Sequence, residues 1–515
     1  MQKLDEKSFE IYSNFKKEID LLYNMNPEKA LKQVKKIDKV EGLPQKAFDG
    51  LKASIYVDVG YFVGDPNIVN EGVKIFQTQL NEDKDDFDLS YNLANGLFNL
   101  ASLFPFKNDP DWFLNTFDLR KKARYLYNRC ARYCDNREIK TQAFTNLGNV
   151  LIGSGRRLEA LDSYINALKQ NPQNGIASAG AAKILLFYLN HGFSDSEILK
   201  SVVAKYINLA KLSTDTIIKY GGKNSLEKLS NLLKMKIDTE FKFDLSTLKP
   251  YEKFIALNRL ALSPVIEGID LTSSKWDSLI IESIIEPHDS EFGVPPIFPM
   301  YNILKSDYLA ARWLAYIALE TKIEDTGFYM DSLDYGNYGI DISLLTIAQS
   351  ICLNILDKIA IATSEYFNLN GNIKQIDFSN RWYSKRKVGE AIEWHPAIKQ
   401  EIGKGNFAII GLSELSEDLK EEGCLELKRS IRNSSTHRFT ILHDMMGEYR
   451  ECKYIEHYRI SEFKYELIDT LQVVRSALFY FVEMIGTNEY FKKQKAPRLC
   501  HLNVPSHHFV RGEVS

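Results

Sequence analysis

An arginine and a histidine stand five positions apart in the segment RNSSTHRFTILHD, residues 432–444. The polar residues between Arg432 and His437, which begin with Asn433, are poor in helix interiors and common in caps and turns. They predict that one helix ends near Arg432 and that another begins just before His437. Such a break lets both side chains face one cleft, and the positive end of the second helix favours a neutral imidazole.

A neutral histidine can take the proton from a ribose 2′-hydroxyl while a guanidinium neutralises the oxygens of the phosphorane. The pair therefore predicts cleavage of RNA without a metal, which leaves a 2′,3′-cyclic phosphate. DNA lacks this hydroxyl and is not expected to be cut. The alternative interpretation is a helix-capping histidine beside a solvated arginine.

The same spacing occurs again in RFTILH, between Arg438 and His443. The intervening residues 439–442 are apolar or β-branched, and they predict a helix that runs from His437 through HRFTILHDMMGEY. Five residues on an unbroken helix place two side chains about 140° apart. We therefore predict a structural role for this second pair.

A basic segment, NRWYSKRK at residues 380–387, is the main candidate for contact with a substrate. It interleaves aromatic rings with cations, so unpaired bases could stack on the rings while the cations meet phosphates. An ordinary basic surface turn has the same composition. The candidate substrate-binding residues are Arg381, Trp382, Tyr383, Lys385, Arg386 and, directly after the first motif, Arg438.

No cofactor or metal is expected. The tail holds Cys500, His501, His507 and His508, which are zinc-ligand types, but their spacing matches no ordered zinc site. The sequence also shows no Walker-type phosphate loop, no nucleophile elbow and no paired-carboxylate motif.

The elements that position the motif are predicted to form a helical bundle over residues 301–495. Long helical periodicities begin at residues 306, 342, 415, 437 and 460. Polar caps predict helix starts at Ser306-Asp307 and Ser461-Glu462. The segment EPHDSEFGVPPIFPM, residues 286–300, has four prolines and is predicted to be a linker. Residues 496–515 are predicted to be a tail.

Residues 1–285 are predicted to form repeated helical hairpins. The clearest hairpin is FTNLGNVLIGSGRRLEALDSYINALKQNPQN, from Phe144 to Asn174. Gly148 falls on its first helix, Gly155 in the turn and Tyr164 on its second helix, at spacings that resemble the tetratricopeptide (TPR) repeat. Because one hairpin cannot bury its own apolar face, at least three stacked units are expected. The chain as a whole is predicted to be all-α, with a TPR-like solenoid followed by the bundle.

A helical bundle whose late helices carry arginine, a polar residue, three further residues and histidine resembles the HEPN superfamily (higher eukaryotes and prokaryotes nucleotide-binding). ARWLAYIALE, EYFNL and RNSSTHRFTILHD are similar to the branch in which a TPR-like solenoid precedes the HEPN bundle. Many members are metal-independent endoribonucleases of toxins and antiviral defence. The resemblance implies that Arg432 and His437 are catalytic and that Asn433 fills the polar position after the arginine.

A homodimer through the carboxy-terminal bundle is also expected. One arginine and one histidine are few groups for activating the hydroxyl, neutralising the phosphate and protonating the leaving oxygen. Two copies across a two-fold axis supply a base, an acid and two cations, and the family resemblance implies the same arrangement. LQVVRSALFYFVEMI, residues 471–485, is a candidate contact, although this pattern equally suits the core of one chain.

Composition narrows the function classes. With 44% hydrophobic and 26% charged residues, the chain is typical of a folded protein. It has no apolar run near the ~20 residues of a membrane span and no secretory signal. Its six thinly spread cysteines suit reduced thiols, so we expect a cytoplasmic protein without a membrane partner. A net charge of −3 provides no global basic field, so contact with RNA depends on a local patch.

Two functions are consistent with these patterns. The first is an endoribonuclease effector of the toxin or antiviral-defence type, whose solenoid senses or docks a protein or peptide trigger. The alternative is a TPR adaptor whose HEPN-like domain is catalytically silent and only dimerises or binds nucleotide. The solenoid itself is either a docking surface or a purely structural element.

Overall fold

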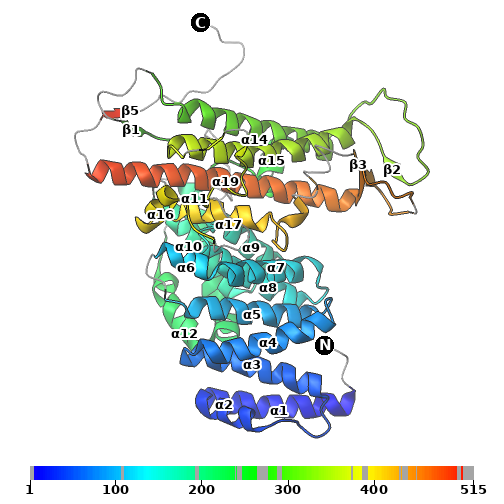
Figure 1. The fold of residues 1–515 in the computed structure, drawn as a ribbon, viewed down its shortest axis with the longest axis vertical. Helices are drawn as coiled ribbons and strands as arrows, with labels where there is room; N and C mark the ends of the chain where they lie inside the picture. The colour runs from blue at the N-terminus through cyan, green and yellow to red at the C-terminus, as the bar shows by residue number, and fades with distance from the viewer. Residues whose placement is uncertain are drawn as a thin grey trace. The chain divides into compact units, whose positions relative to one another are not determined.

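The computed structural model describes most of the chain. The described residues are 5–105, 109–191, 196–237, 239, 246, 248–263, 277–286, 293–369, 371–372, 375–384, 392–428, 431, 439–447, 449–495 and 500–502. Helices dominate and the strands are short, so the predicted all-α class is confirmed (Figure 1). The chain divides into two compact units. Unit 1 consists of Met1–Asp195, Lys200–Glu240 and Glu417–Glu426, and unit 2 of Ser196–Leu199, Phe241–Ser416 and Leu427–Ser515.

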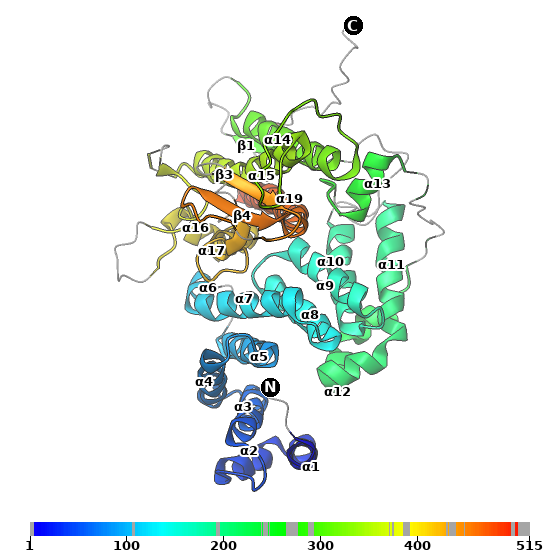
Figure 2. The ribbon, with the colours of Figure 1, turned by 90° about the vertical axis from the view of Figure 1, so that its right-hand side faces the viewer.

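Unit 1 is a helical solenoid in which helices pack on their neighbours along the sequence (Figures 1 and 2). Its helices are α1 (Glu6–Met25), α2 (Pro27–Lys36), α3 (Gln45–Val63), α4 (Pro66–Glu82), α5 (Phe87–Leu103), α6 (Pro110–Asn115), α7 (Phe117–Tyr133), α8 (Arg137–Gly153), α9 (Arg157–Gln170), α10 (Gly175–Asn190), most of α11 (Glu197–Leu212) and α12 (Thr214–Lys234). Asp86 and Asn136 illustrate how these helices begin, since each side chain accepts a backbone N–H of the first turn.

The predicted hairpin from Phe144 to Asn174 is confirmed as α8 and α9. Gly155 makes the turn with φ +71°, a conformation that favours glycine. A Cβ atom on Gly148 would lie 2.6 Å from the ring of Tyr164, and one on Gly180 of α10 would lie 2.5 Å from the same ring. The two glycines therefore let three successive helices close around one buried tyrosine.

A buried ionic cluster surrounds Asp418 in unit 1. Arg124 donates to the two carboxylate oxygens from Nε at 2.7 Å and from Nη2 at 2.9 Å, and Arg156 donates to the same carboxylate. The Cys424 thiol donates to it at 3.0 Å. Burial alone would raise the pKa of Asp418, but attraction to Arg124 and Arg156 outweighs burial and lowers the pKa to about 2.

Unit 2 is built on three long helices that pack on one another: α14 (Ile297–Glu320), α15 (Ile340–Tyr366) and α19 (Ile460–Lys495) (Figure 1). Its shorter helices are α13 (Pro250–Leu257), α16 (Pro396–Gly403) and most of α17 (Ala408–Asp418), whose last two residues belong to unit 1. Among the described residues, α15 is long and apolar enough to cross a membrane by length and composition alone, and half of its most apolar window is buried. Its contacts with α14 and α19 account for this apolar character as that of a core helix.

Five short strands accompany these helices in the described part of the chain. β1 (Ile284–Glu286) pairs antiparallel with β5 (Cys500–Leu502). A second sheet has the order β2 (Gly336–Asn337), β3 (Phe439–His443), β4 (Ile455–Arg459). β2 and β3 are antiparallel, whereas β3 and β4 are parallel.

The predicted helix from His437 to Tyr449 is wrong in its described part, because residues 439–443 form strand β3. The run FTIL is aromatic and β-branched, and such a short apolar run fits a helix or a strand equally well. Pairing with β2 and β4 on both sides selects the strand. The 140° separation expected for Arg438 and His443 therefore does not apply.

Two helix boundaries also differ from the expectation. α14 begins at Ile297, well before the predicted cap at Ser306, so the end of the expected linker is helical. Its prolines lie before or within the first turn, where a backbone N–H has no helical partner. The helix expected from Leu415 is interrupted after Asp418, and residues 419–425 form turns. A Cβ on Gly423 would lie 2.2 Å from the Asp418 carbonyl oxygen, so this turn requires glycine.

Candidate functional site

The arginine–histidine motif lies between two anchored ends of the chain. Arg432, Asn433, His437 and Arg438 are outside the described residues, as are Lys385 and Arg386 of the basic segment. What the structure describes is the chain immediately before and after the motif.

Before the motif, Lys428 anchors the chain to α19. Its ammonium lies 2.7 Å from a Glu466 oxygen and 2.6 Å from an Asp469 oxygen, and its side chain is 1% exposed. Ile431 is buried as well. A buried lysine with two carboxylates is fixed in place, since separating the charges would leave them unpaired in a poor solvent. Lys428 is thus a structural residue.

After the motif, the backbone enters the sheet at Phe439. The Phe439 amide donates to the Tyr454 carbonyl oxygen at 2.8 Å. β3 then runs parallel to β4, and β4 leads directly into α19 at Ile460. Both ends of the motif segment are therefore attached to residues 454–469, at the start of α19.

The described part of the basic segment is less accessible than its composition suggested. Arg381 is half-buried and donates to the Ser364 hydroxyl and to the Leu369 carbonyl oxygen, and burial lowers its pKa. Trp382 is 0% exposed, and its indole N–H donates to the Phe378 carbonyl oxygen at 2.8 Å. A ring in this position offers no face to a base.

Tyr383, the next residue, is half-buried. Its ring stacks on Trp394 with the centroids 5.1 Å apart. One face of the tyrosine ring is therefore occupied within the chain.

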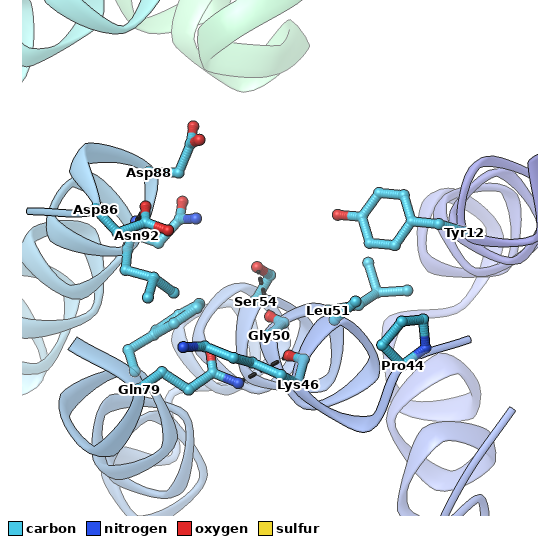
Figure 3. A pocket seen from close by; sticks show the side chains of 13 residues that line it. Tyr12, Pro44, Lys46, Gly50, Leu51, Ser54, Gln79, Asp86, Asp88 and Asn92 are labelled. Atoms are coloured by element: carbon cyan, nitrogen blue, oxygen red, sulfur yellow. Dashed lines mark hydrogen bonds between the residues drawn. The ribbon is translucent and has the colours of Figure 1, made fainter. Parts of the chain in front are cut away.

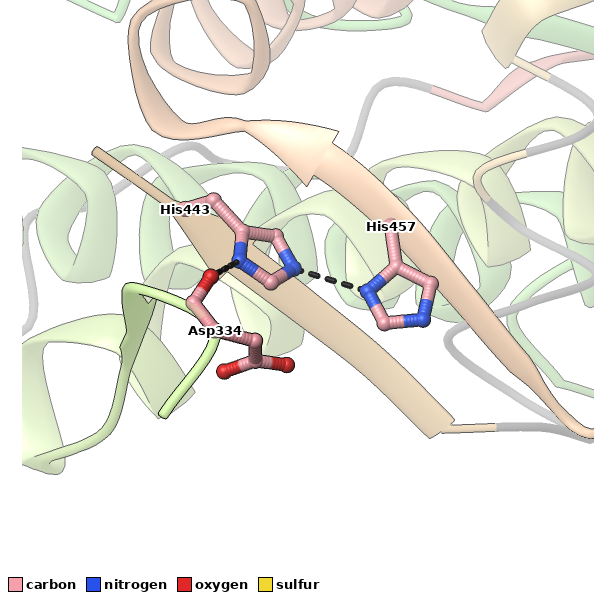
Figure 4. Close-up of side chains that lie close together, drawn as sticks. All are labelled: Asp334, His443 and His457. Carbon is pink, nitrogen blue, oxygen red and sulfur yellow. Dashed lines mark hydrogen bonds between the residues drawn. The ribbon is translucent and has the colours of Figure 1, made fainter. Parts of the chain in front are cut away.

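Two histidines and an aspartate meet at one end of the second sheet (Figure 4). His443 Nδ1 lies 2.8 Å from the main-chain oxygen of Asp334, and His443 Nε2 lies 2.7 Å from His457 Nδ1. One ligand-type atom of each residue lies within 4.8 Å of the other two. The strand register explains the meeting, because Gly336 is paired with His443 and Ile441 with His457.

The hydrogen bonds define the tautomers of this histidine pair. A carbonyl oxygen only accepts, so His443 carries its proton on Nδ1 and accepts from His457 through Nε2. His457 Nε2 is buried and has no hydrogen-bond partner. Tyr449 stacks on His457 with the centroids 3.7 Å apart. Burial, followed by the charge on His443, lowers the pKa of His457 and favours its neutral form.

Asp334 is held by its own turn. Its carboxylate accepts from the Ser332 hydroxyl at 2.5 Å and from the Gly336 amide at 3.1 Å. The bond from Ser332 is the main reason why its pKa is lowered. Leu333 and Tyr335 on either side have φ +57° and +59°, which is rare for residues with a side chain.

This cluster combines two imidazoles and a carboxylate, the ligand types that bind divalent transition metals. Sequence reasoning considered only His443, and only as a decoy for the catalytic pair. Asp334 and His457 carry no recognisable spacing relative to it. The pairing of β2 and β4 with β3 was the missing signal.

A set of large apolar side chains is exposed around β2 and β3 of unit 2, and we call it the apolar surface. It comprises Phe328, Tyr329, Met330, Leu333, Tyr335, Tyr338, Phe439, Met445, Met446, Tyr449 and Tyr454. Phe439 is 72% exposed and stands directly after Arg438. In contrast, most apolar residues of 471–485 in α19 are buried within the chain. Their pattern therefore fits a core helix better than a dimer contact.

Unit 1 contains a pocket lined by α1, α3, α4, α5 and the residues before α3 and α5 (Figure 3). Gln79 is 6% exposed and donates through Nε2 to the Lys46 carbonyl oxygen at 2.8 Å, while its Oε1 is buried without a partner. Tyr12, Asp86 and Asp88 also line this pocket. It combines an apolar floor with carboxylates and an unpaired amide oxygen.

Comparison with known proteins identifies the carboxy-terminal part of the chain. Residues 288–488 match the family model described as LA2681-like HEPN. No curated protein matches the chain. The matched range begins inside the predicted linker and contains the whole arginine–histidine motif and the histidine cluster.

Proposed function

We propose that the protein is a metal-independent endoribonuclease, starting from the match of residues 288–488 to the LA2681-like HEPN family model. The observation that carries the proposal is the presence, inside the matched range, of Arg432, Asn433 and His437 in the order arginine, polar residue, three residues, histidine. The HEPN group includes ribonucleases, which supports the reaction class.

The proposed reaction needs a base and a cation. Neutral His437 takes the proton from the ribose 2′-hydroxyl, and the oxygen attacks the adjacent phosphorus. Arg432 neutralises the charge that develops on the phosphorane oxygens. The bond to the 5′-oxygen breaks, and the upstream fragment ends in a 2′,3′-cyclic phosphate. Asn433 supports the geometry as the polar residue after the arginine.

The anchored ends of the motif segment favour this role. Lys428 is fixed on α19 and Phe439 is fixed at the sheet, so the segment between them is tethered on both sides. Catalysis by positioning requires such supports, because a loose base loses most of its effect.

We propose a homodimer in which the apolar surface of one copy contacts that of a second. Groups of exposed large apolar side chains mark interaction sites in soluble proteins. Phe439 belongs to the surface and adjoins the motif, so this contact would bring the two motif segments together. The dimer would then supply two arginines and two histidines to one RNA strand.

The RNA is proposed to reach the motif along a basic path. Arg438, Lys385 and Arg386 would contact phosphates, and the ring of Tyr383 would stack on a base. Arg381 contributes charge while its side chain holds the turn at Leu369. Trp382 is left out of this path because it is buried.

The solenoid is proposed to dock a protein or peptide trigger in the pocket of unit 1. Asp86, Asp88 and the unpaired Gln79 Oε1 all accept hydrogen bonds, so a segment that presents lysine or arginine beside an apolar residue would suit them. Such a trigger would make the protein an effector of the toxin or antiviral-defence type that acts on cytoplasmic RNA.

The test compares cleavage of a 5′-labelled RNA by wild type, Arg432→Ala and His437→Ala in the presence of EDTA. We expect each variant to lose about 10²–10⁴-fold in rate, because the base or the phosphate cation is removed. The product should end in a cyclic phosphate, and an RNA with 2′-O-methyl groups should resist. The matched control is His191→Ala, an exposed histidine of unit 1, which should cleave at the wild-type rate.

Three outcomes would contradict the proposal. They are cleavage by His437→Ala at the wild-type rate, cleavage that requires a metal, and cleavage of DNA at a similar rate. A wild type that binds nucleotide but cuts nothing would instead support the silent adaptor. Activity per chain is measured across dilution together with sedimentation of the full chain, and a fully active monomer would exclude the composite dimer site.

A further inference from the structure

Asp334, His443 and His457 join three segments that are far apart along the chain. His443 is 109 residues from Asp334 and 14 residues from His457. Ordinary core packing does not require two imidazoles and a carboxylate to converge at a sheet end. Apolar residues at these positions would bury the same area without the cost of desolvating polar groups.

The orientation of His443 is that of a metal ligand. Histidines that bind metals through one nitrogen usually donate the other N–H to a carbonyl or carboxylate, which fixes the ring. His443 donates Nδ1–H to the Asp334 main-chain oxygen and directs the Nε2 lone pair toward His457, and ligand-type atoms of all three residues lie within 4.8 Å of one another (Figure 4). His443 itself is 0% exposed, so its direction is set by the protein and not by solvent.

We propose that Asp334, His443 and His457 bind one divalent transition-metal ion that fastens the β2–β3–β4 sheet. Neutral imidazole nitrogens and a carboxylate oxygen are suitable ligands for such an ion. Three protein ligands leave a fourth position for water. The strained backbone on both sides of Asp334 fits a carboxylate that is held in position for binding.

For the two histidines, the geometry needs only a small adjustment. Zinc–nitrogen bonds of about 2.0–2.1 Å at a tetrahedral angle set two ligand nitrogens about 3.3 Å apart. The facing nitrogens of the two rings are 2.7 Å apart and share one proton. The ion takes the place of that proton, the rings separate by about half an ångström, and the proton moves to the other nitrogen of His457.

The ion has a structural role that is separate from RNA cleavage. Strand β3 begins two residues after His437 and ends at His443, so the metal would hold the far end of the strand that follows the motif. It contributes no group to the 2′-hydroxyl chemistry. The inference therefore stands or falls independently of the proposed ribonuclease activity.

The experiment measures zinc binding by the full chain in which His437→Ala removes any cleavage. The protein also carries His507→Ala and His508→Ala, because the tail contains further zinc-ligand types. After treatment with a chelator, ZnCl₂ is titrated against a zinc-binding dye, and Co²⁺ absorption reports the ligand geometry. We expect one zinc per chain and a higher Tm in its presence.

Two variants in this background assign the site. His457→Ala and Asp334→Asn should each weaken zinc binding by at least about tenfold, and His191→Ala should leave it unchanged. The proposal would be overturned if the background protein took up no zinc. It would also be overturned if both ligand variants bound zinc as tightly as the background protein. If far-ultraviolet circular dichroism shows that His457→Ala is unfolded, Asp334→Asn decides, since it keeps the shape of the side chain.

Discussion

The cluster around Asp418 in unit 1 and the cluster around His443 in unit 2 each centre on a fully buried polar side chain, but they differ in how many of their hydrogen-bonding atoms have partners. The Asp418 carboxylate accepts hydrogen bonds from two guanidiniums and a thiol. In the histidine cluster, one proton lies between the two facing imidazole nitrogens, and His457 Nε2 has no hydrogen-bond partner among the described residues.

The difference separates two uses of buried polar groups. A saturated cluster has no capacity left for a ligand, so its contribution is to stability and to the arrangement of the chain. An unsaturated cluster costs stability unless something else completes it. We therefore assign structure to the first and binding to the second, and three measurements can break or sharpen this assignment.

The largest effect is expected for Asp418→Ala. The change leaves Arg124 and Arg156 buried without their shared carboxylate, and breaking a buried ion pair in this way costs about 3–5 kcal/mol. Urea unfolding of the full chain gives the free energy of unfolding. The control is Asp85→Ala, because Asp85 pairs with Arg129 while its side chain is 94% exposed, and such pairs contribute about 0–1 kcal/mol. Equal losses in both variants would contradict the assignment.

A smaller effect is expected from acid. The pKa of Asp418 is about 2 in the folded protein and 3.8 when the group is unperturbed, so its contribution is present above pH 4. It is lost as the pH falls from about 4 to about 2, and it amounts to about 2 kcal/mol. The free energy of unfolding is compared between wild type and Asp418→Asn at each pH. A wild-type curve parallel to that of the variant below pH 4 would refute the linkage.

The smallest effect is expected for Tyr449→Leu. The tyrosine ring stacks on His457, and stacked aromatic pairs contribute about 0.5–1.5 kcal/mol beyond the area that they bury. Thermal unfolding of the zinc-free protein measures the loss. Tyr449→Phe keeps the ring and should retain the wild-type Tm, so the same loss in both variants would show that stacking does not support the histidine.

Local patterns were sufficient where the structure is local. The α8–α9 hairpin followed from Gly148, Gly155 and Tyr164, because contacts between neighbouring helices impose short, fixed spacings. The start of α19 at Ile460 followed from its apolar period, although Ser461, predicted as the cap, lies inside the first turn. The predicted start of α14 at Ser306 is wrong. Prolines break a helix only in its interior, and α14 accommodates Pro299 in its first turn.

Local sequence patterns did not predict the pairing of strands that are far apart in the sequence. Residues 439–443 form a strand only because β2 and β4 supply partners on both sides. The histidine cluster depends on that register, so Asp334 and His457 carried no sequence signal of their own. Arg432 and His437 remain predictions, supported by the family match over residues 288–488. The prediction that the Trp382 ring is exposed for base stacking is wrong. Its indole N–H donates to the Phe378 carbonyl oxygen, and its ring packs against the Phe378 ring.

The segment Glu417–Glu426 has a consequence for how the two halves of the chain can be exchanged. It belongs to unit 1, although the chain on both sides belongs to unit 2. A gene fragment that began at residue 288 would encode Asp418 without Arg124 and Arg156. Recombination that exchanged the amino-terminal half would lose the same partners unless the incoming half carried two arginines at the corresponding positions. An exchange of either half alone is therefore expected to leave buried charges without partners.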